Sequence, residues 1–382
     1  MPKVSVIIPS FNHEKYVRAA IESVLTQSFQ DFEIVVTDDG SRDRTAEEVA
    51  AIGDKRISLT VLPRNYGVCI ASNASIHRAK GQYLAWLASD DLFLPGKLEK
   101  QVRFLDENPE VGGVVSWPAF VDENGRPFGA EDNKYNKDNI LTQTKNSPRH
   151  AWLRHFFFRG NALCSSTLMI RRSCYDKVGL HNPALAQLAD FEMWVRLLGV
   201  YEIHLIEEPL VGFRVREGAM NASALRPEVI VRDQWEWRKV LEQYLYLDDG
   251  LLLKVFPELA GYQAGTSHAG IVRKLAFKAL QRYIPRDTEP DRSICAGLPD
   301  SDPRRSLRWG LAQLALAVGK PSHILFAFDT MYDMLGKATD DSIYRDFIGH
   351  TGIYDPLGSL FNIPQNRKMD TWTDFAKKEA AT

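Results

Sequence analysis

The sequence contains few cysteines, and none of them lies close to another. The four cysteines of the 382-residue chain are Cys69, Cys164, Cys174 and Cys295, and no C-x-x-C motif occurs among them. This spacing argues against a disulfide framework and against a zinc site. We therefore expect the protein in a reducing, cytoplasmic compartment.

Long apolar runs are missing as well. The most apolar tracts, such as residues 311–318, are well below the ~20 apolar residues that a membrane-spanning helix needs. The N-terminus enters a strand-like run at once, without a basic segment followed by a leader-type apolar stretch, so we expect no secretion signal. Any membrane association would therefore be peripheral, at the inner face of the membrane.

An excess of charge of one sign is also absent. The chain has 47 Lys and Arg residues against 49 Asp and Glu residues, which gives a formal net charge of −2. We expect no nucleic-acid partner, and any site for a polyanion must be local. With 45% hydrophobic and 25% charged residues, the composition excludes disordered and collagen-like chains and is typical of a globular protein of two or three domains.

The first hundred residues alternate between two apolar patterns. Continuous β-branched runs suit strands that are buried on both faces, and the segments between them have the period of helices. The strand-like runs are residues 4–9, 32–37, 57–62 and 83–88. This order predicts βαβ units and a mainly parallel α/β sheet with flanking helices, and it places Asn12 and Ser41 as N-caps of the first two helices.

The later segments continue this pattern and then change it. We expect strands at residues 111–121, 166–170 and near 202–205, helices at 151–158 and 191–200, and an exposed loop at 122–149. From about residue 225 onward helical patterns dominate, so residues 226–382 are predicted to form a C-terminal α-helical extension.

Residues 271–286 of that extension form a basic amphipathic segment that has no acidic residue. Such a helix could lie on anionic lipid headgroups. More commonly a helix of this kind packs its apolar face on its own domain and leaves its charges in solvent.

Paired carboxylates follow two of the predicted strands: Asp38 and Asp39 in one case, Asp90 and Asp91 in the other. Adjacent acids raise each other's pKa, and a divalent cation relieves this repulsion. Mg²⁺ and Mn²⁺ prefer oxygen ligands and commonly take one or two carboxylates together with substrate phosphates, so Asp90 and Asp91 are candidates for a metal and diphosphate site. Asp38 and Asp39, before Gly40 and a serine, could accept hydrogen bonds from a base or a ribose. Both pairs could instead be helix caps.

The runs at residues 4–12, 37–41, 65–67 and 89–91, together with Asn73, resemble the inverting family 2 glycosyltransferases of GT-A fold, which is Rossmann-like. The resemblance covers about the first 215 residues. It implies that Pro9, Phe11 and Asp39 hold the uracil and ribose of a nucleotide sugar. It also implies that Asp90 lies near the donor ribose and phosphates and that Asp91 is the metal ligand. The other residues assigned to nucleotide-sugar binding are Asn12, Asn65, Asn73, Ser89, Arg214 and Arg216.

Residues 160–161, 165–172 and 190–197 look like the acceptor-side segment of the same enzymes, in which Asp190 matches the catalytic base. A carboxylate there takes the proton of the attacking hydroxyl. Asn161 and Trp194 are assigned to the acceptor. The alternatives are an N-cap role for Asp190 and a core position for Trp194, while the rival base Glu192 points about 200° around the helix from Asp190.

The chain departs from the family pattern at four places. Ala88, Ala189 and Ser72 stand where relatives often have an acid, an acid and a basic residue, respectively, and Arg216 stands where they often have histidine. Arginine cannot ligate a metal but pairs well with phosphate. We therefore expect Arg214 and Arg216 to close over the diphosphate, with weak metal affinity as a result. A solvated surface pair is the alternative.

The expected protein is a metal-dependent inverting glycosyltransferase. It would move a sugar from a nucleotide sugar, expected to be a UDP-sugar, to a hydroxyl of a glycan or lipid-linked acceptor in polysaccharide or glycoconjugate biosynthesis, with Mn²⁺ or Mg²⁺ as cofactor. Residues 1–110 would form the nucleotide-sugar half and residues 111–225 the acceptor half of the catalytic domain. The alternatives are a nucleotidyltransferase, disfavoured because residues 9–15 lack a glycine-rich basic loop, and a non-catalytic nucleotide-sugar or glycan-binding module.

Overall fold

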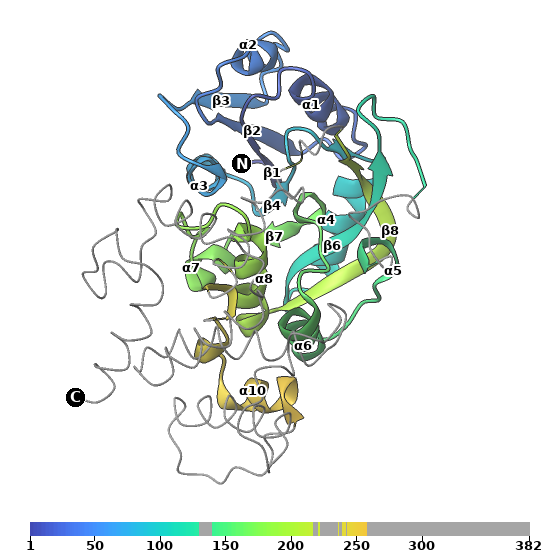
Figure 1. The fold of residues 1–382 in the computed structure, drawn as a ribbon. Coiled ribbons are helices and arrows are strands. Elements are labelled where there is room, and N and C mark those ends of the chain that lie inside the picture. The colour runs from blue at the N-terminus through green and yellow to red at the C-terminus, as the bar shows by residue number, and fades with distance from the viewer. Residues whose placement is uncertain (130–139, 217–220, 222–235, 237–238, 242, 258–382) are drawn as a thin grey trace, which may run out of the picture. The chain divides into compact units, whose positions relative to one another are not determined.

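The computed structural model describes residues 1–129, 140–216, 221, 236, 239–241 and 243–257. It contains one sheet of eight strands in the described part of the chain. In spatial order the strands are β3 (Ile57–Val61), β2 (Phe32–Asp38), β1 (Val4–Ser10), β4 (Tyr83–Trp86), β7 (Met169–Arg171), β6 (Val111–Val121), β8 (Glu202–Arg214) and β5 (Leu92–Phe93). Figure 1 shows these strands with helices flanking the sheet.

The sheet is parallel in its N-terminal half and mixed beyond it. β3, β2, β1 and β4 are all parallel, as the alternating pattern predicts. β7 is antiparallel to both of its neighbours, β6 and β8 are parallel, and β5 is antiparallel to β8. The predicted α/β class with flanking helices is confirmed, and the antiparallel pairings at β7 and β5 are what the sequence did not indicate.

Helices cover both faces of the parallel half. The helices of the first part of the chain are α1 (Val17–Leu25), α2 (Thr45–Ala50), α3 (Val68–Arg78) and α4 (Lys97–Glu107). Apolar residues of α1 and α4 form one core with Val4, Val6 and Ile8 of β1, all fully buried. Thr37 of β2 faces the other way and its Oγ1 lies 2.6 Å from Ser75 Oγ of α3, so α3 covers the opposite face.

The acceptor-side region follows the same expectations with different boundaries. Its helical elements are α5 (Ile140–Gln143), α6 (Arg149–Arg159), the 3₁₀ turn η3 (Ser165–Thr167), α7 (Cys174–Val178) and α8 (Ala189–Val200). The strand predicted at 166–170 is only β7, because residues 165–167 form the turn. The strand predicted near 202–205 extends to Arg214 as β8, and residues 130–139 of the predicted loop lie outside the described residues.

Two predicted helix caps are wrong, and the reason bears on the site. α1 begins at Val17 and α2 at Thr45, several residues after Asn12 and Ser41. The Asn12 amide oxygen instead accepts from the backbone N–H of Arg42 at 2.9 Å, and the Asn12 N–H donates to Ser41 Oγ at 2.9 Å. These polar residues bind the loops after β1 and β2 to each other at the carboxyl edge of the sheet.

The chain divides into two compact units, residues 1–156 with 160–225 and residues 157–159 with 226–382. In the second unit the described elements are η5 (Gln243–Tyr246) and α10 (Asp249–Val255). Phe157 packs edge-on against Tyr244 and Phe256 there, with ring centroids 5.3 and 4.9 Å away. The predicted helical extension otherwise lies outside the described residues, including the basic segment 271–286.

A search of the described helices for a membrane-crossing segment gives none of sufficient length and apolar character.

Candidate active site

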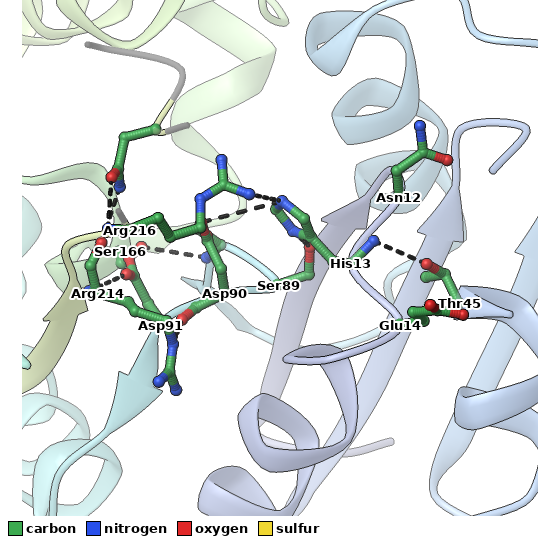
Figure 2. Close-up of polar contacts among 12 residues, drawn as sticks. Asn12, His13, Glu14, Thr45, Ser89, Asp90, Asp91, Ser166, Arg214 and Arg216 are labelled. Atoms are coloured by element: carbon green, nitrogen blue, oxygen red, sulfur yellow. Dashed lines mark hydrogen bonds and ion pairs between the residues drawn. The ribbon is translucent and has the colours of Figure 1, made fainter. Parts of the chain in front are cut away.

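The acid pair lies in the loop that follows β4, at the carboxyl edge of the parallel strands. Asp90 and Asp91 are nearly buried, with 9% and 3% of their surface exposed. Figure 2 shows them between the end of β8 and the loop after β1. Strand ends at this edge are where ligands bind in α/β sheets. The structure therefore gathers the predicted metal and diphosphate residues where the sequence placed them.

Asp91 is held by two hydrogen bonds from different elements. Its Oδ2 accepts from Ser166 Oγ of η3 at 2.5 Å, and its Oδ1 accepts from the backbone N–H of Arg214 at 2.9 Å. Burial, together with the neighbouring charge of Asp90, raises the pKa of Asp91 to about 7 against the lowering effect of these two bonds. A carboxylate in this environment favours a positive partner.

Asp90 faces a basic group contributed by the end of β8. Its Oδ2 lies 3.3 Å from Arg216 Nε and 3.9 Å from His13 Nε2. Arg216 Nη1 lies 2.9 Å from His13 Nε2, and His13 Nδ1 lies 2.7 Å from Ser89 Oγ. Because arginine only donates, Nε2 of His13 accepts, and Nδ1 therefore carries the proton toward Ser89. Burial, the largest influence, lowers the pKa of His13 and favours this neutral form.

His13 was not predicted as a site residue. The available signal was its position, because it follows Phe11 and Asn12 in the loop after β1, at the same sheet edge as the acid pair. Its side chain is brought there by the backbone, since the His13 N–H donates to Thr45 Oγ1 at 2.8 Å.

The two arginines that were predicted to close over the diphosphate have different roles. Arg214 is buried, and its guanidinium donates to the backbone oxygens of Asp90 at 2.6 Å, Asp122 at 3.0 Å and Glu123 at 2.6 Å. It braces the loops around the acid pair through Nε and Nη1, and its binding of the diphosphate stays a prediction. Arg216 lies over Asp90 and His13 (Figure 2) and stays a candidate for the diphosphate.

The nucleotide-side candidates lie around the ends of β1 and β2. Asp39 is buried, and its carboxylate accepts from the backbone N–H groups of Tyr66 and Gly67, both at 2.8 Å. Burial nevertheless raises its pKa, because desolvation outweighs these bonds. Phe11 is 37% exposed beside the half-buried Pro9, and Asn65 is exposed. An open aromatic face and a desolvated carboxylate are the features that a base and a ribose would contact.

The turn at Gly40 explains why these loops lie so close together. Gly40 has φ +68°, and a Cβ atom there would lie 2.5 Å from the backbone carbonyl carbon of Arg64. Only glycine fits a position that has both a positive φ and a backbone contact of this kind. The residue after Asp39 thus brings the loop after β3 onto the nucleotide side.

Asn73 is not free to bind a donor in this structure. Its Nδ2 donates to the His181 carbonyl oxygen at 2.8 Å, and its Oδ1 accepts from the His181 N–H at 3.0 Å. The predicted donor role is replaced by a bond between α3 and the segment before α8.

Asp190 lies at the second residue of α8 and is partly exposed. The N-cap position is Leu188, so the cap alternative is wrong for Asp190, whose Oδ1 accepts from the Phe191 N–H at 2.7 Å. Burial raises the pKa of the Cys164 thiol, and the charges of Asp91 and Asp190 raise it further. Asp91 and Asp190 therefore both act electrostatically on one side chain, that of Cys164, the residue before η3.

Glu192 is excluded as the base by its surroundings. It is 2% exposed, and its two carboxylate oxygens accept from Arg196 Nε and Nη2, both at 2.8 Å. Trp194, assigned to the acceptor with a core position as the alternative, is 1% exposed and belongs to the core. Asn161 is half-buried and its Oδ1 accepts from the Leu163 N–H at 3.0 Å, so its side chain shapes the turn before η3.

Asp90 and Asp91 are the side chains predicted to coordinate a divalent cation. Among the residues that the structure describes, no three His, Cys, Asp or Glu side chains come together as a group that could hold a metal ion. Asp90 and Asp91 offer two adjacent carboxylates, and Mg²⁺ commonly takes only one or two from the protein when substrate phosphates complete its shell. The pair thus fits a divalent ion held together with a diphosphate, and does not form a cage by itself.

Comparison with known proteins agrees with this geometry. The model of glycosyl transferase family 2 matches residues 5–173. An uncharacterized glycosyltransferase of Rickettsia typhi is 30% identical over 287 residues, which cover 74% of this chain and 82% of that protein. The chain belongs to glycosyl transferase family 2. An uncharacterized glycosyltransferase of Methanocaldococcus jannaschii is also 30% identical, over 56% of this chain and 71% of the relative.

Solved structures give the same fold for this family 2 glycosyltransferase. Residues 1–349 of Staphylococcus aureus TarS match with a TM-score of 0.54 at 17% identity, over 87% of this chain and 88% of TarS. The same TarS fragment in complex with UDP-GlcNAc matches with a TM-score of 0.56 at 19% identity, over 87% of this chain and 88% of TarS. At this level of identity the likeness shows the GT-A fold.

Proposed function

We propose that this family 2 glycosyltransferase transfers a sugar from a UDP-sugar to an acceptor hydroxyl with inversion at the anomeric carbon, assisted by a divalent cation. The observation that carries the proposal is the placement of two functional groups around one turn. Asp91 is held by Ser166 of η3, and both Asp91 and Asp190 act electrostatically on Cys164, the residue before η3. We propose that leaving-group and base chemistry meet at one reacting centre beside this turn.

The nucleotide would occupy the edge formed by the loops after β1 and β2. Phe11 offers an exposed ring for the base, and Asp39 offers carboxylate oxygens to its N–H or to a ribose hydroxyl. Arg216 and His13 lie next to Asp90, where a diphosphate would follow the ribose. A uridine nucleotide is supported by the TarS structure that contains UDP-GlcNAc.

Asp90 and Asp91 would hold the cation. When bound, a divalent cation neutralises the charge that develops on a leaving diphosphate. Arg216 places a second positive charge beside Asp90, so part of this neutralisation comes from the chain itself. We therefore propose that Mn²⁺ or Mg²⁺ increases the rate of sugar transfer and that some transfer remains without the metal.

Asp190 would act as the base. Its carboxylate takes the proton of the acceptor hydroxyl while that oxygen attacks the anomeric carbon and the bond to the diphosphate breaks on the opposite face. A single displacement inverts the anomeric centre, so an α-linked donor gives a β-linked product. The acceptor class, a glycan or lipid-linked sugar in polysaccharide or glycoconjugate synthesis, and a cytoplasmic location remain part of this proposal.

The test begins with a panel of UDP-, dTDP- and GDP-sugars, each incubated with the enzyme and Mn²⁺, with Mg²⁺ or with EDTA. We expect release of UDP from one or more UDP-sugars, reduced but not abolished by EDTA. Proton NMR of the transferred sugar is expected to show the β configuration from an α-linked donor. Release of diphosphate instead of UDP would support the nucleotidyltransferase alternative, and an α-linked product would overturn inversion.

A further inference from the structure

Helix α3 is tied to the segment that leads into Asp190. Asn73 of α3 makes two hydrogen bonds with the backbone of His181, one in each direction, at 2.8 and 3.0 Å. A side-chain amide that bonds both the N–H and the C=O of one residue fixes that residue in position and in orientation. His181 lies nine positions before Asp190.

A second contact joins the same two parts of the chain four residues away along the helix. Cys69 Sγ donates to the Leu185 carbonyl oxygen at 3.1 Å. Cys69, Leu185 and Ala189 also form a small buried apolar cluster. Since Cys69 and Asn73 are i and i+4 neighbours, one face of α3 holds the segment from His181 to Ala189 along its length. Ala189 is the residue directly before Asp190.

The side chain of His181 joins a third element to this arrangement. Its ring is nearly buried and packs edge-on against Trp86 of β4, with ring centroids 4.7 Å apart. Burial lowers the pKa of this ring to about 3, and the backbone of Ala189 acts against that lowering. Trp86 ends the strand whose continuation carries Asp90 and Asp91. His181 therefore lies among the strand of the acid pair, the helix of the base and α3.

Helix α3 is itself fixed on the nucleotide side. Asp39 accepts from the N–H groups of Tyr66 and Gly67, and Gly67 is the N-cap of α3. Near its other end, Arg78 donates to the Val36 carbonyl oxygen at 2.7 Å. The helix is bound at one end to the residue that follows β2 and at the other end to β2 itself, so its position relative to this strand is fixed.

We propose that α3 positions the catalytic base, with Asn73 and His181 as positioning residues that set Asp190 relative to Asp90 and Asp91. The Asn73 amide is bonded to the His181 backbone, so the proposal gives neither residue a contact with the donor. The inference rests on the proposed function, because it takes Asp190 as the base of sugar transfer.

The first experiment separates positioning from donor binding. Asn73→Ala is compared with His77→Ala, a matched change at an exposed residue of the same helix. Binding of UDP is measured by calorimetry, and turnover as release of UDP from a UDP-sugar that the wild type consumes. We expect Asn73→Ala to bind UDP within about twofold of wild type and to lose on the order of 10- to 100-fold in kcat, the scale of an ångström-level misplacement. His77→Ala should match wild type in both. Loss of UDP affinity with unchanged kcat would overturn the proposal in favour of donor binding.

The second experiment asks whether Asn73 acts through Asp190. Asn73→Ala is combined with Asp190→Asn, and the residual turnover of the double variant is compared with that of each single variant. A residue that acts through the base loses its effect once the base is gone, so the two losses should not multiply. Multiplicative losses would overturn the positioning role and leave the proposed function intact. Wild-type turnover in Asp190→Asn alone would instead overturn the proposed function.

Two substitutions of His181 test whether the shape of its ring is what matters. The Nε2 atom of His181 is buried without a hydrogen-bond partner, so the packing of its ring on Trp86 and its backbone bonds to Asn73 are what the inference requires. His181→Phe keeps both and should retain turnover within about threefold, whereas His181→Ala should lose on the order of tenfold or more. Equal turnover in the Phe and Ala variants, both folded, would contradict the inference.

Discussion

Asp190 and Glu192 lie two positions apart on α8, and their surroundings assign them different tasks. Asp190 is partly exposed, whereas Glu192 is buried in a two-point contact with Arg196. The sequence could predict that the two side chains point in different directions, since that follows from helix geometry. It could not predict which of them pairs with Arg196 in a buried position, because that depends on tertiary packing.

Replacement of Glu192 by Gln should therefore lower stability and leave the chemistry in place. Removing one charge from a buried ion pair costs about 3–5 kcal/mol, because the other charge remains buried. We expect the free energy of unfolding, measured by urea denaturation, to fall by about that amount, with turnover per folded molecule within about twofold of wild type. Lost turnover in a protein of unchanged stability would return Glu192 to consideration as the base.

Arg214 and Arg216 are also two positions apart, and their side chains have different surroundings. Their spacing and charge predicted a shared phosphate role, but Arg214 donates to three backbone carbonyl oxygens while Arg216 lies beside Asp90 and His13. The carbonyl oxygens that receive Arg214 belong to loops, and no local sequence pattern reports where loop carbonyls point.

Arg216→Gln is expected to weaken UDP binding by roughly 10- to 100-fold, which is the scale of about 1.5–3 kcal/mol for a hydrogen bond to a charged group. The matched control is Arg103→Gln, which changes an exposed arginine of α4. Calorimetric titration with UDP, with and without Mn²⁺, measures both. Equal affinities for wild type and Arg216→Gln would remove Arg216 from the diphosphate site.

At the scale of elements, apolar periodicity predicted the strands and helices that are defined by their own residues. It missed the features that depend on how strands pair. The buried strands β1 and β2 and the helices α6 and α8 follow directly from runs of apolar residues. β8 is longer than predicted because Glu207, Glu208 and Pro209 interrupt its pattern, and the pairing of β6 with β8 shifts register at that point. The neighbouring strand β6 accommodates this interruption through the shift in register. The sequence of residues 202–214 alone does not contain that information.

Helix α4 contains a fully buried lysine, which sequence patterning would have placed in solvent. Lys97 is buried with its Nζ donating to Gln101 Oε1 at 2.6 Å, and Gln101 Nε2 donates to the Thr167 carbonyl oxygen of η3 at 2.7 Å. Burial lowers the pKa of Lys97 to about 7. Through Gln101, Lys97 thus supports η3, the turn that contains Ser166.

The sign of the pH dependence follows from that pKa. Between pH 10.5 and pH 7 the unfolded chain has protonated Lys97 while the folded protein keeps it largely neutral, so the wild type loses stability as the pH falls through this range. Lys97→Met lacks this loss. We expect the Tm of Lys97→Met minus that of wild type to rise as pH falls from about 10 to 7 and then level off. Lys80→Met, a change at an exposed lysine, should show a constant difference. A constant difference for Lys97→Met would contradict burial as the cause.

At the scale of the whole molecule, the sequence predicted the architecture because the parallel half of the sheet is built from units adjacent in the chain. The carboxyl ends of β1, β2 and β4 meet at one edge and bring Phe11, Asp39 and the pair Asp90 and Asp91 there, as expected. The connection from Asn73 through His181 to Asp190 spans more than a hundred residues of sequence, so no local pattern could reveal it.

Ligand binding should register as a change in the stability of the first unit. A ligand at 100 times its dissociation constant stabilises by about 2.7 kcal/mol. We expect UDP alone to raise the Tm, and Mn²⁺ to raise it further only when UDP is present, because the carboxylate pair fits a cation that shares its shell with a diphosphate. In Asp91→Asn the UDP effect should persist while the added effect of Mn²⁺ disappears. An unchanged Mn²⁺ effect in that variant would place the cation elsewhere.

The most direct measurement is the turnover of Asp190→Asn, made beside its UDP affinity and its thermal stability. Loss of a general base typically costs 10²- to 10⁴-fold, so we expect UDP release from the donor to fall by at least about 100-fold. UDP affinity should stay within about twofold of wild type, since Asp190 lies on the acceptor side. Turnover near the wild-type rate in a folded Asp190→Asn protein that binds UDP would contradict the assignment of the base and the proposed mechanism with it.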